Sequence, residues 1–261
     1  MATSRTAAAP LAAYVLHSYD WSETSLIVEL FTRERGRVAV AAKGAKRPTS
    51  QLRAVLLPFQ PLAAHLGRTP ADEAAEIHTL KTAEWVGGAP LLAAPALFPA
   101  FYLNELLMKG LARQDPHPAL FDAYAETLAA LAEGGDEAAA LRAFELLLLR
   151  ETGHLPALDA QTLTLAPLQA SEPYRLVAEG GLRAAHADDA AWLPGQSWRR
   201  LAASLADEAP WTATLTVVVG LPGEQRGSLR RQLGELLHYH GGGATLRTRQ
   251  LLQDAQRLMA T

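Results

Sequence analysis

The spacing of apolar residues changes near residue 81, and this change divides the chain into a β-rich part and a helical part. In the first part apolar side chains recur at every second position, as at Leu26, Val28 and Leu30. A period of two is typical of strands with one buried face. Such β-prone segments occur at 12–16, 25–32, 37–42, 55–66 and 74–80. Five short strands predict a small closed barrel, and the OB-fold is the commonest five-stranded barrel with a nucleic-acid-binding face.

From Thr82 onward the apolar residues follow three- and four-residue spacing, which is the period of a helix. We expect the stripes that this spacing forms to be the core of a helical bundle. The first contains Leu97, Phe101, Leu103, Leu107 and Leu111, and the second Leu120, Tyr124, Leu128 and Leu131. The next helix has a favourable N-cap in Asp136 and a favourable stop in Gly153.

Residues 154–185 lose the helical period, and two short apolar segments joined across Gly180-Gly181 predict a hairpin at 174–185. Helices are predicted again around 198–206, 229–238 and 249–259. The β-branched run at 212–219 fits either a strand or a buried turn of helix. The predicted fold class is α+β, with a barrel domain at 1–80 and a helical domain at 81–261.

Residues 30–53, LFTRERGRVAVAAKGAKRPTSQLR, concentrate positive charge on the second and third predicted strands. They hold seven basic side chains and one acidic side chain, a net charge of +6 in a chain whose total is −3. A hairpin that carries its cations to one end can hold a phosphate backbone. The same cations also fit a solvated sheet edge, where lysine and arginine prevent aggregation between strands. Charge alone leaves both interpretations open.

Charge is segregated along the rest of the chain. Residues 81–225 carry nine basic and eighteen acidic side chains, whereas residues 226–261 carry six basic and two acidic ones. This separation can steer an anionic ligand to particular faces. The absence of cysteine excludes disulfides, thiol catalysis and cysteine-ligated zinc or iron–sulfur sites.

The cellular compartment is inferred from what the sequence lacks. A cysteine-free chain fits a reducing cytoplasm. No apolar run reaches the ~18 residues that a membrane span needs. Pro10 interrupts the small apolar run near the start, so residues 1–16 are interpreted as a loose tail and a first strand, not as a signal peptide.

Three separated segments resemble those of one family, the bacterial recombination mediator RecO. LHSYDWSETSLIVELFTRERGRVAVAAKGAKRP (16–48) is similar to its N-terminal signature, and FYLNELLMKGLARQDPHPALFDAY (101–124) to the signature of its helical domain. GGGATLRTRQLL (241–252) resembles the family segment Gly-Gly-x-x-Leu-Lys-Ser-Arg-x-Leu. The segments occur in the family's order and cover both ends and the middle of the chain.

This resemblance implies an OB-fold domain, a helical domain and a role that is not enzymatic. Such proteins bind single- and double-stranded DNA and anneal complementary strands coated by single-strand-binding protein. With RecR they promote RecA loading at gaps, in the bacterial cytoplasm at the nucleoid. Many members carry a four-cysteine zinc module after the helical domain. Because cysteine is absent here, residues 154–190 are expected to be a degenerate form of this module, without the zinc site.

The resemblance makes phosphate contact the expected role of the basic hairpin. The candidate cations are Arg33, Arg35, Arg37, Lys43, Lys46, Arg47 and Arg53. Trp21 lies in the loop HSYDWSE, where an exposed ring can stack on a base, although it can also pack under the loop. Arg247 and Arg249 flank Thr248, a predicted N-cap, and are either a phosphate site or solvated arginines.

The helical domain of the family binds the acidic, phenylalanine-ended tail of single-strand-binding protein. A tail of this kind needs an apolar pocket and a cation for its terminal carboxylate. Arg142 is the candidate cation, with Lys109 and Arg113 as alternatives. Arg142 can instead form an ion pair with Glu145 on the same helix.

Metal binding and catalysis are not predicted. His238 and His240 are two positions apart, so on a helix they point to different faces and chelate poorly. No cofactor motif, nucleotide loop or paired acid and base stands out, and Arg230 and Arg231 are interpreted as a solvated helix face. The alternative function is a protein-interaction scaffold whose acidic middle makes the contacts and whose DNA contact is incidental.

Overall fold

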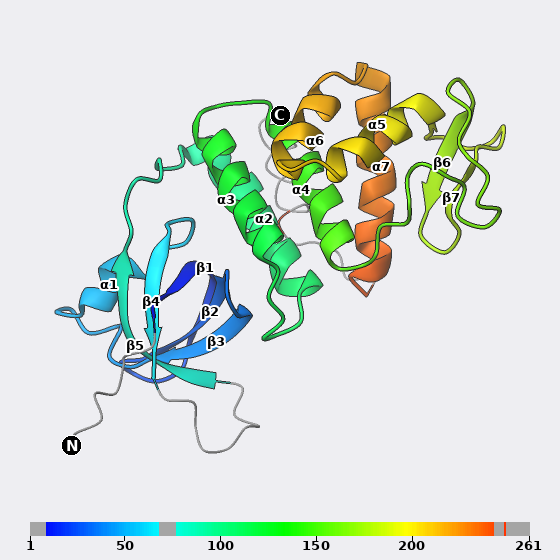
Figure 1. The fold of residues 1–261 in the computed structure, drawn as a ribbon. Coiled ribbons are helices and arrows are strands. Elements are labelled where there is room, and N and C mark those ends of the chain that lie inside the picture. Colours follow the sequence, from blue (N-terminus) through cyan, green and yellow to red (C-terminus); the bar gives the residue numbers. More distant parts are fainter. Residues whose placement is uncertain (1–8, 68–76, 243–247, 249–261) are drawn as a thin grey trace, which may run out of the picture. The chain divides into compact units, whose positions relative to one another are not determined.

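The computed structural model describes residues 9–67, 77–242 and 248. The chain divides into two units, whose elements are labelled in Figure 1. Unit 1 comprises Met1–Leu92 and Leu111–Asp122, and unit 2 comprises Ala93–Gly110 and Ala123–Thr261. Within the described residues no helix has the length and apolar character to cross a membrane.

Unit 1 is built on a closed barrel with the strand order β1-β2-β3-β5-β4. Its strands are β1 (Leu11–Asp20), β2 (Leu26–Thr32), β3 (Gly36–Ala42), β4 (Leu62–Leu66) and β5 (Ile77–Trp85). The β3–β5 pair is parallel, whereas the other four pairs are antiparallel. Alternate residues such as Val28, Leu30, Val38 and Val40 fill the interior. The predicted five-stranded barrel of OB-fold type is confirmed.

The segment between β3 and β4 differs from the sequence prediction. The predicted strand at 55–66 is wrong in its first half, because α1 (Gln51–Val55) precedes an irregular stretch and β4 begins only at Leu62. Pro58 and Pro61 lack the N–H that a strand ladder needs. Phe59 between them has a φ of 66°, which no strand residue adopts. The last strand also extends further than predicted, to Trp85.

The segment Leu111–Asp122 lies against the β2–β3 hairpin. The Gln114 N–H donates to Arg37 O at 2.9 Å. Gly36, at a φ of 64°, comes so close to Asp115 that a Cβ there would lie 1.8 Å from the Asp115 carbonyl oxygen. The Phe121 ring centroid lies 5.3 Å from that of Tyr14 and 5.4 Å from that of Phe31. Because any Cβ at position 36 would clash with Asp115, only glycine permits the turn to come this close to Asp115.

Unit 2 contains most of the helices. They are α2 (Ala94–Gly110), α3 (Pro118–Ala132, in unit 2 from Ala123), α4 (Glu137–Glu151), α5 (Gly195–Leu205), α6 (Pro210–Val219) and α7 (Gly223–His240). The α4 helix contacts α2, α6 and α7, and nearly all its side chains from Ala139 to Leu149 are buried. Asp136 caps α4 by accepting the Ala139 N–H at 3.0 Å, as predicted, and Gly153 follows its end at a φ of 73°.

The predicted hairpin is confirmed and belongs to a three-stranded sheet. β6 (Pro173–Val177) pairs with β7 (Gly181–Ala184) on one side and with β8 (Leu193–Pro194) on the other. Trp198 of α5 is fully buried, and its Nε1–H donates to Tyr174 O of β6 at 3.1 Å. Within the described part of the chain, no group of three His, Asp or Glu side chains is arranged to hold a metal ion.

Two helical expectations need adjustment. Residues 212–219, for which the sequence fits either a strand or a helix, lie in α6, whose buried face is formed by Trp211, Thr214 and Val218.

Leu97 and Phe101 of the predicted core stripe are 37% and 43% exposed. Ala96, Ala100 and other residues of α2 face the core instead, so the buried stripe of α2 is shifted around the helix. The predicted helix at 249–259 lies outside the described residues.

Candidate nucleic-acid interface

The loop that follows β3 carries three of the candidate cations and is tied to the loop between β1 and β2. Lys46 N–H donates to Thr24 O at 2.9 Å, and Gly44 N–H donates to Ser25 Oγ at 3.3 Å. Gly44 has a φ of 72°, a conformation that glycine adopts without strain. These bonds bring Lys43, Lys46 and Arg47 next to the loop that contains Trp21.

Most side chains of this region are open to solvent. Lys43, Arg47 and Arg53 are exposed and make no ion pair with the described residues. The Lys46 Nζ lies 3.2 Å from Asp20 Oδ1, on a carboxylate that is 83% exposed. Lys46 and Arg53 also line a shared hollow of about 300 Å³. Trp21 is 56% exposed, so its ring does not pack under the loop. We call Trp21, Lys43, Lys46, Arg47 and Arg53 the loop-end surface.

Arg33, Arg35 and Arg37 lie at the other end of the same hairpin. β2 and β3 have seven residues each, so the two ends are about 20 Å apart at ~3.4 Å per residue. The hairpin therefore separates its cations into two groups, one at each end. We call Arg33, Arg35 and Arg37 the turn-end group.

Acidic residues hold two of the turn-end arginines. Arg33 makes a bidentate ion pair with Asp122, with Nε 2.9 Å from Oδ1 and Nη2 2.8 Å from Oδ2. Glu29 is 1% exposed. Its Oε1 lies 2.6 Å from Arg113 Nη2, and its Oε2 lies 3.9 Å from Arg37 Nη1. Arg37 and Arg113 thus compensate a buried carboxylate, so removing either side of this arrangement would leave charge poorly compensated in the barrel.

Arg35 is half-buried in the turn, where its N–H donates to Thr32 Oγ1 at 3.1 Å. Its charge also acts on His78 of β5, a residue that is 2% exposed. Burial, and to a smaller extent the positive charge of Arg35, lower the pKa of the His78 imidazole. His78 is therefore neutral at pH 7, and it adds no charge to this end of the barrel.

The three candidates for the carboxylate of a bound tail have different environments. Arg142 is buried and forms an ion pair with Glu145, which also accepts the Tyr102 O–H at 2.6 Å. Arg113 belongs to unit 1, where it pairs with Glu29. Lys109 lines an opening together with apolar residues of α2, α4 and α7, and its Nζ lies 2.9 Å from Glu105 Oε1. The apolar lining consists of Leu106, Leu148, Leu149 and Leu237.

Arg247 and Arg249 lie outside the described residues, whereas Thr248 between them is described. Thr248 donates to Glu105 Oε2 twice, from its N–H at 3.0 Å and from its Oγ1 at 2.6 Å. Glu105 therefore links Thr248 to the helix that carries Lys109.

Basic-residue patterns in the sequence do not indicate the acidic partners Asp122 and Glu29. Asp122 is 89 residues from Arg33, and no local pattern connects them. Glu29 does have a signal, because it is the one acid within the strand LIVELFT. A carboxylate on a buried strand requires a cation nearby, so the paired arginines could have been anticipated there.

Comparison with known proteins identifies the family of the chain. Residues 10–89 match the family described as recombination protein O N terminal, and residues 95–250 match recombination protein O C terminal. Proteins described as DNA repair protein RecO are similar over nearly their full length. That of Variovorax paradoxus is 54% identical over 252 residues, or 94% of this chain and 96% of the relative. That of Polaromonas sp. is 52% identical over 260 residues, or 99% and 100%.

A third relative, the DNA repair protein RecO of Delftia acidovorans, is 55% identical over 249 residues, or 94% of this chain and 96% of the relative. Both family descriptions and all three relatives agree with the resemblance seen in the sequence. Two matches that together span residues 10–89 and 95–250 leave little of the chain outside them. The chain therefore belongs to the RecO family of DNA repair proteins, which are recombination mediators and not enzymes.

Proposed function

We propose that the protein binds single- and double-stranded DNA and anneals complementary strands that are coated by single-strand-binding protein. The loop-end surface carries this proposal. Four cations and an exposed tryptophan lie on adjoining loops and on α1, and three of the cations have no acidic partner among the described residues. Cations that follow a phosphate backbone beside a ring that stacks on bases are typical of single-strand binding.

An annealing assay tests this function directly. Complementary oligonucleotides are coated with single-strand-binding protein and mixed with the purified chain in the absence of ATP. We expect duplex to form faster than in a control without the protein, and to form more slowly as salt is raised. No acceleration at any salt concentration would exclude the annealing function.

The opening lined by Lys109 is our proposed site for the tail of single-strand-binding protein. The opening measures about 60 Å³, so its leucines must move apart to receive a phenylalanine ring, and the Lys109 ammonium beside them can meet the terminal carboxylate. Arg142 is less suited, because Glu145 already holds its guanidinium in a buried site. A fluorescent peptide that ends in Asp-Phe should bind Lys109→Ala several-fold more weakly than the natural protein. Lys81→Ala, a change at an exposed lysine of β5, is the control and should leave peptide affinity unchanged.

Family membership supports the remaining parts of the proposal, namely cooperation with RecR to load RecA at gaps and a place in the cytoplasm at the nucleoid. Co-purification of RecR with the chain tests whether the two proteins associate. RecA loading at gaps that requires both proteins would show that they cooperate in the complete reaction.

A further inference from the structure

A groove of about 930 Å³ runs along α7 in unit 2, and the proposed function does not yet use it. One wall is the face of α7 that carries Arg230, Arg231 and His238. The facing wall contains Trp192, from the loop that precedes β8. Among the described residues, the acids that line it are Glu224 and Glu235.

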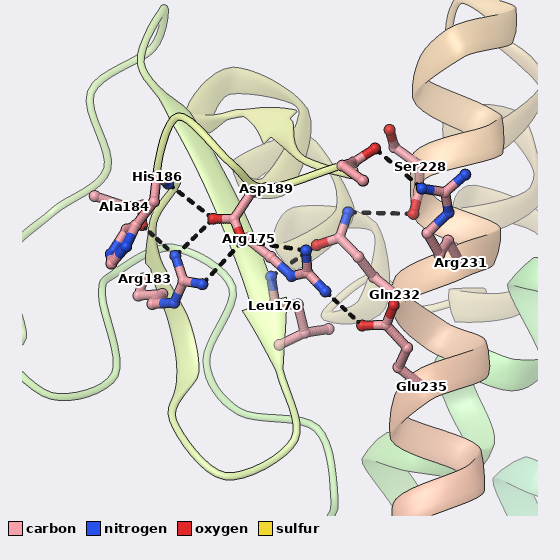
Figure 2. Close-up of polar contacts among 11 residues, drawn as sticks. Arg175, Leu176, Arg183, Ala184, His186, Asp189, Ser228, Arg231, Gln232 and Glu235 are labelled. Atoms are coloured by element: carbon pink, nitrogen blue, oxygen red, sulfur yellow. Dashed lines mark hydrogen bonds and ion pairs between the residues drawn. The ribbon is translucent and has the colours of Figure 1, made fainter.

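One ion pair and two hydrogen bonds hold β6 and the loop that precedes β8 against α7 (Figure 2). Arg175 of β6 bridges the two walls, with Nη1 3.1 Å from Asp189 Oδ1 and Nη2 2.9 Å from Glu235 Oε2. The Leu176 N–H donates to Gln232 Oε1 at 2.7 Å. In addition, Arg231 Nη1 donates to Ala190 O at 3.2 Å. The groove is therefore formed before any ligand arrives, which lowers the entropy cost of binding.

Asp189 links several residues of the wall that contains Trp192. It accepts from Arg183 Nη1 at 2.7 Å and Nη2 at 3.0 Å, and from the His186 N–H at 2.8 Å. The hydrogen bonds from Arg183, followed by that from His186, hold the pKa of the Asp189 carboxyl far below its usual range. Asp189 stays charged at every physiological pH, so the wall does not loosen by protonation.

The groove presents cations beside an aromatic ring. Trp192 is 46% exposed. Arg230 is exposed and has no ion pair with the described residues, and Arg231 is exposed although one of its nitrogens bonds Ala190. The charge of Glu235 is compensated by Arg175. Among the described residues, Glu224 is the one acid of the lining that has no basic partner. It precedes Arg230 by six positions, or about 9 Å along the helix, so it does not pair with Arg230.

We propose that this groove binds a second single strand of DNA, with its phosphates on Arg230 and Arg231 and a base stacked on Trp192. The inference rests on the proposed annealing function, because annealing requires two strands to be held at the same time. The loop-end surface supplies one strand site, and the α7 groove supplies the other. From sequence, Arg230 and Arg231 are interpreted as a solvated helix face; in this proposal they bind the phosphates of the second strand.

Photocrosslinking of the full-length protein tests the site directly. A saturating unlabelled oligo(dT) first occupies the tighter site, and a strand that contains 5-iodouracil and cannot pair with oligo(dT) is then added and irradiated. We expect crosslinks in the tryptic peptide 184–199, which contains Trp192. The other tryptophan of this peptide, Trp198, is fully buried. Crosslinks confined to the peptide that contains Trp21 would overturn the proposal.

Three variants test the role of the groove in annealing. Arg230→Gln with Arg231→Gln should lower the log–log salt slope of second-strand binding by about 1.4, at ~0.7 per phosphate contact. The same variant should slow annealing about fivefold or more. Arg230→Gln alone, which keeps the Arg231 bond to Ala190, should give about half of the slope change. The matched control is Arg199→Gln with Arg200→Gln, two exposed arginines of α5 that do not line the groove.

Trp192→Ala should weaken second-strand binding about fivefold or more, and Trp192→Phe should restore most of the affinity because a ring remains.

The results of these experiments distinguish a failure of the groove proposal from a failure of the proposed annealing function. Groove variants that anneal like the Arg199/Arg200 control, while loop-end variants lose DNA, would overturn the groove alone. A natural protein that neither binds nor anneals DNA would overturn both. Groove variants that lose an acidic peptide but keep both strands would assign the groove to a protein and overturn the proposal.

Discussion

The two ends of the β2–β3 hairpin carry the same types of side chain in different surroundings. At the turn end, Asp122 holds Arg33, and the buried Glu29 lies between Arg37 and Arg113. At the loop end, Lys43 and Arg47 are exposed and have no acidic partner among the described residues. The charges of Arg33 and Arg37 are compensated within the protein, whereas those of Lys43 and Arg47 are available to an anion. A count of basic residues does not distinguish the two ends, but their partners do.

The largest effect is expected from removing the buried acid of the turn end. Glu29→Gln removes the buried carboxylate with which Arg37 and Arg113 pair, and breaking a buried pair costs about 3–5 kcal/mol of unfolding free energy. We expect about 3 kcal/mol, because the Arg113 side chain is 36% exposed and water can partly replace the carboxylate. Urea denaturation followed by circular dichroism measures the change.

Asp20→Asn is the matched control, since Asp20 is an exposed acid that pairs with Lys46 at the other end of the barrel. Its effect should be below about 1 kcal/mol. Equal stability losses for Glu29→Gln and Asp20→Asn would contradict the structural role assigned to the turn end.

The next effect concerns DNA affinity at the loop end. Replacing Lys43, Lys46 and Arg47 together by Gln should lower the log–log salt slope of oligo(dT) binding by about 2, at ~0.7 per phosphate contact. Fluorescence anisotropy at a series of salt concentrations gives the slope, and the Arg199/Arg200 variant of unit 2 is the control for lost charge. An unchanged slope would mean that this loop does not contact the backbone.

The sequence predicts the barrel better than it predicts the interface. Every second residue of β2 and β3 is apolar, and this regular pattern by itself predicts paired strands, although both faces of these strands are largely buried in the structure. Strand limits are harder to predict where proline interrupts the pattern. The stretch from Val55 to Pro61 has the composition of a strand but forms the end of α1 and an irregular link.

The cations themselves are evident from composition, but their availability is not. The separation of the two groups follows from strand length alone, since seven extended residues carry the turn away from the loop that follows β3. The pairing of Arg33 with Asp122 depends on how a segment 89 residues later folds back on the barrel. Local patterns carry no information on such a contact. A charge cluster in a sequence therefore identifies candidates, and tertiary structure decides which of them are free to bind.

A smaller effect is expected from the aromatic residue of the loop-end surface. Trp21→Ala should weaken oligo(dT) binding by about 1–3 kcal/mol if one base stacks on the ring, with no change in the salt slope. Trp21→Phe keeps a ring and should retain most of the affinity. Anisotropy at one fixed salt concentration measures both variants. Wild-type affinity for Trp21→Ala would show that the exposed ring has no nucleic-acid contact.

The smallest effect would reveal whether the turn end can join the DNA site. The Arg33 and Asp122 side chains are 47% and 49% exposed, so a phosphate can compete with the carboxylate for the guanidinium. Asp122→Asn should release Arg33 and raise the salt slope by up to about 0.7, while hardly changing the unfolding free energy, because the pair is exposed to solvent. Adding Arg33→Gln to Asp122→Asn should return the slope to its original value. If Asp122→Asn leaves the slope unchanged, Arg33 does not reach the strand even when it is released, and the difference between the two ends is one of position as well as of pairing.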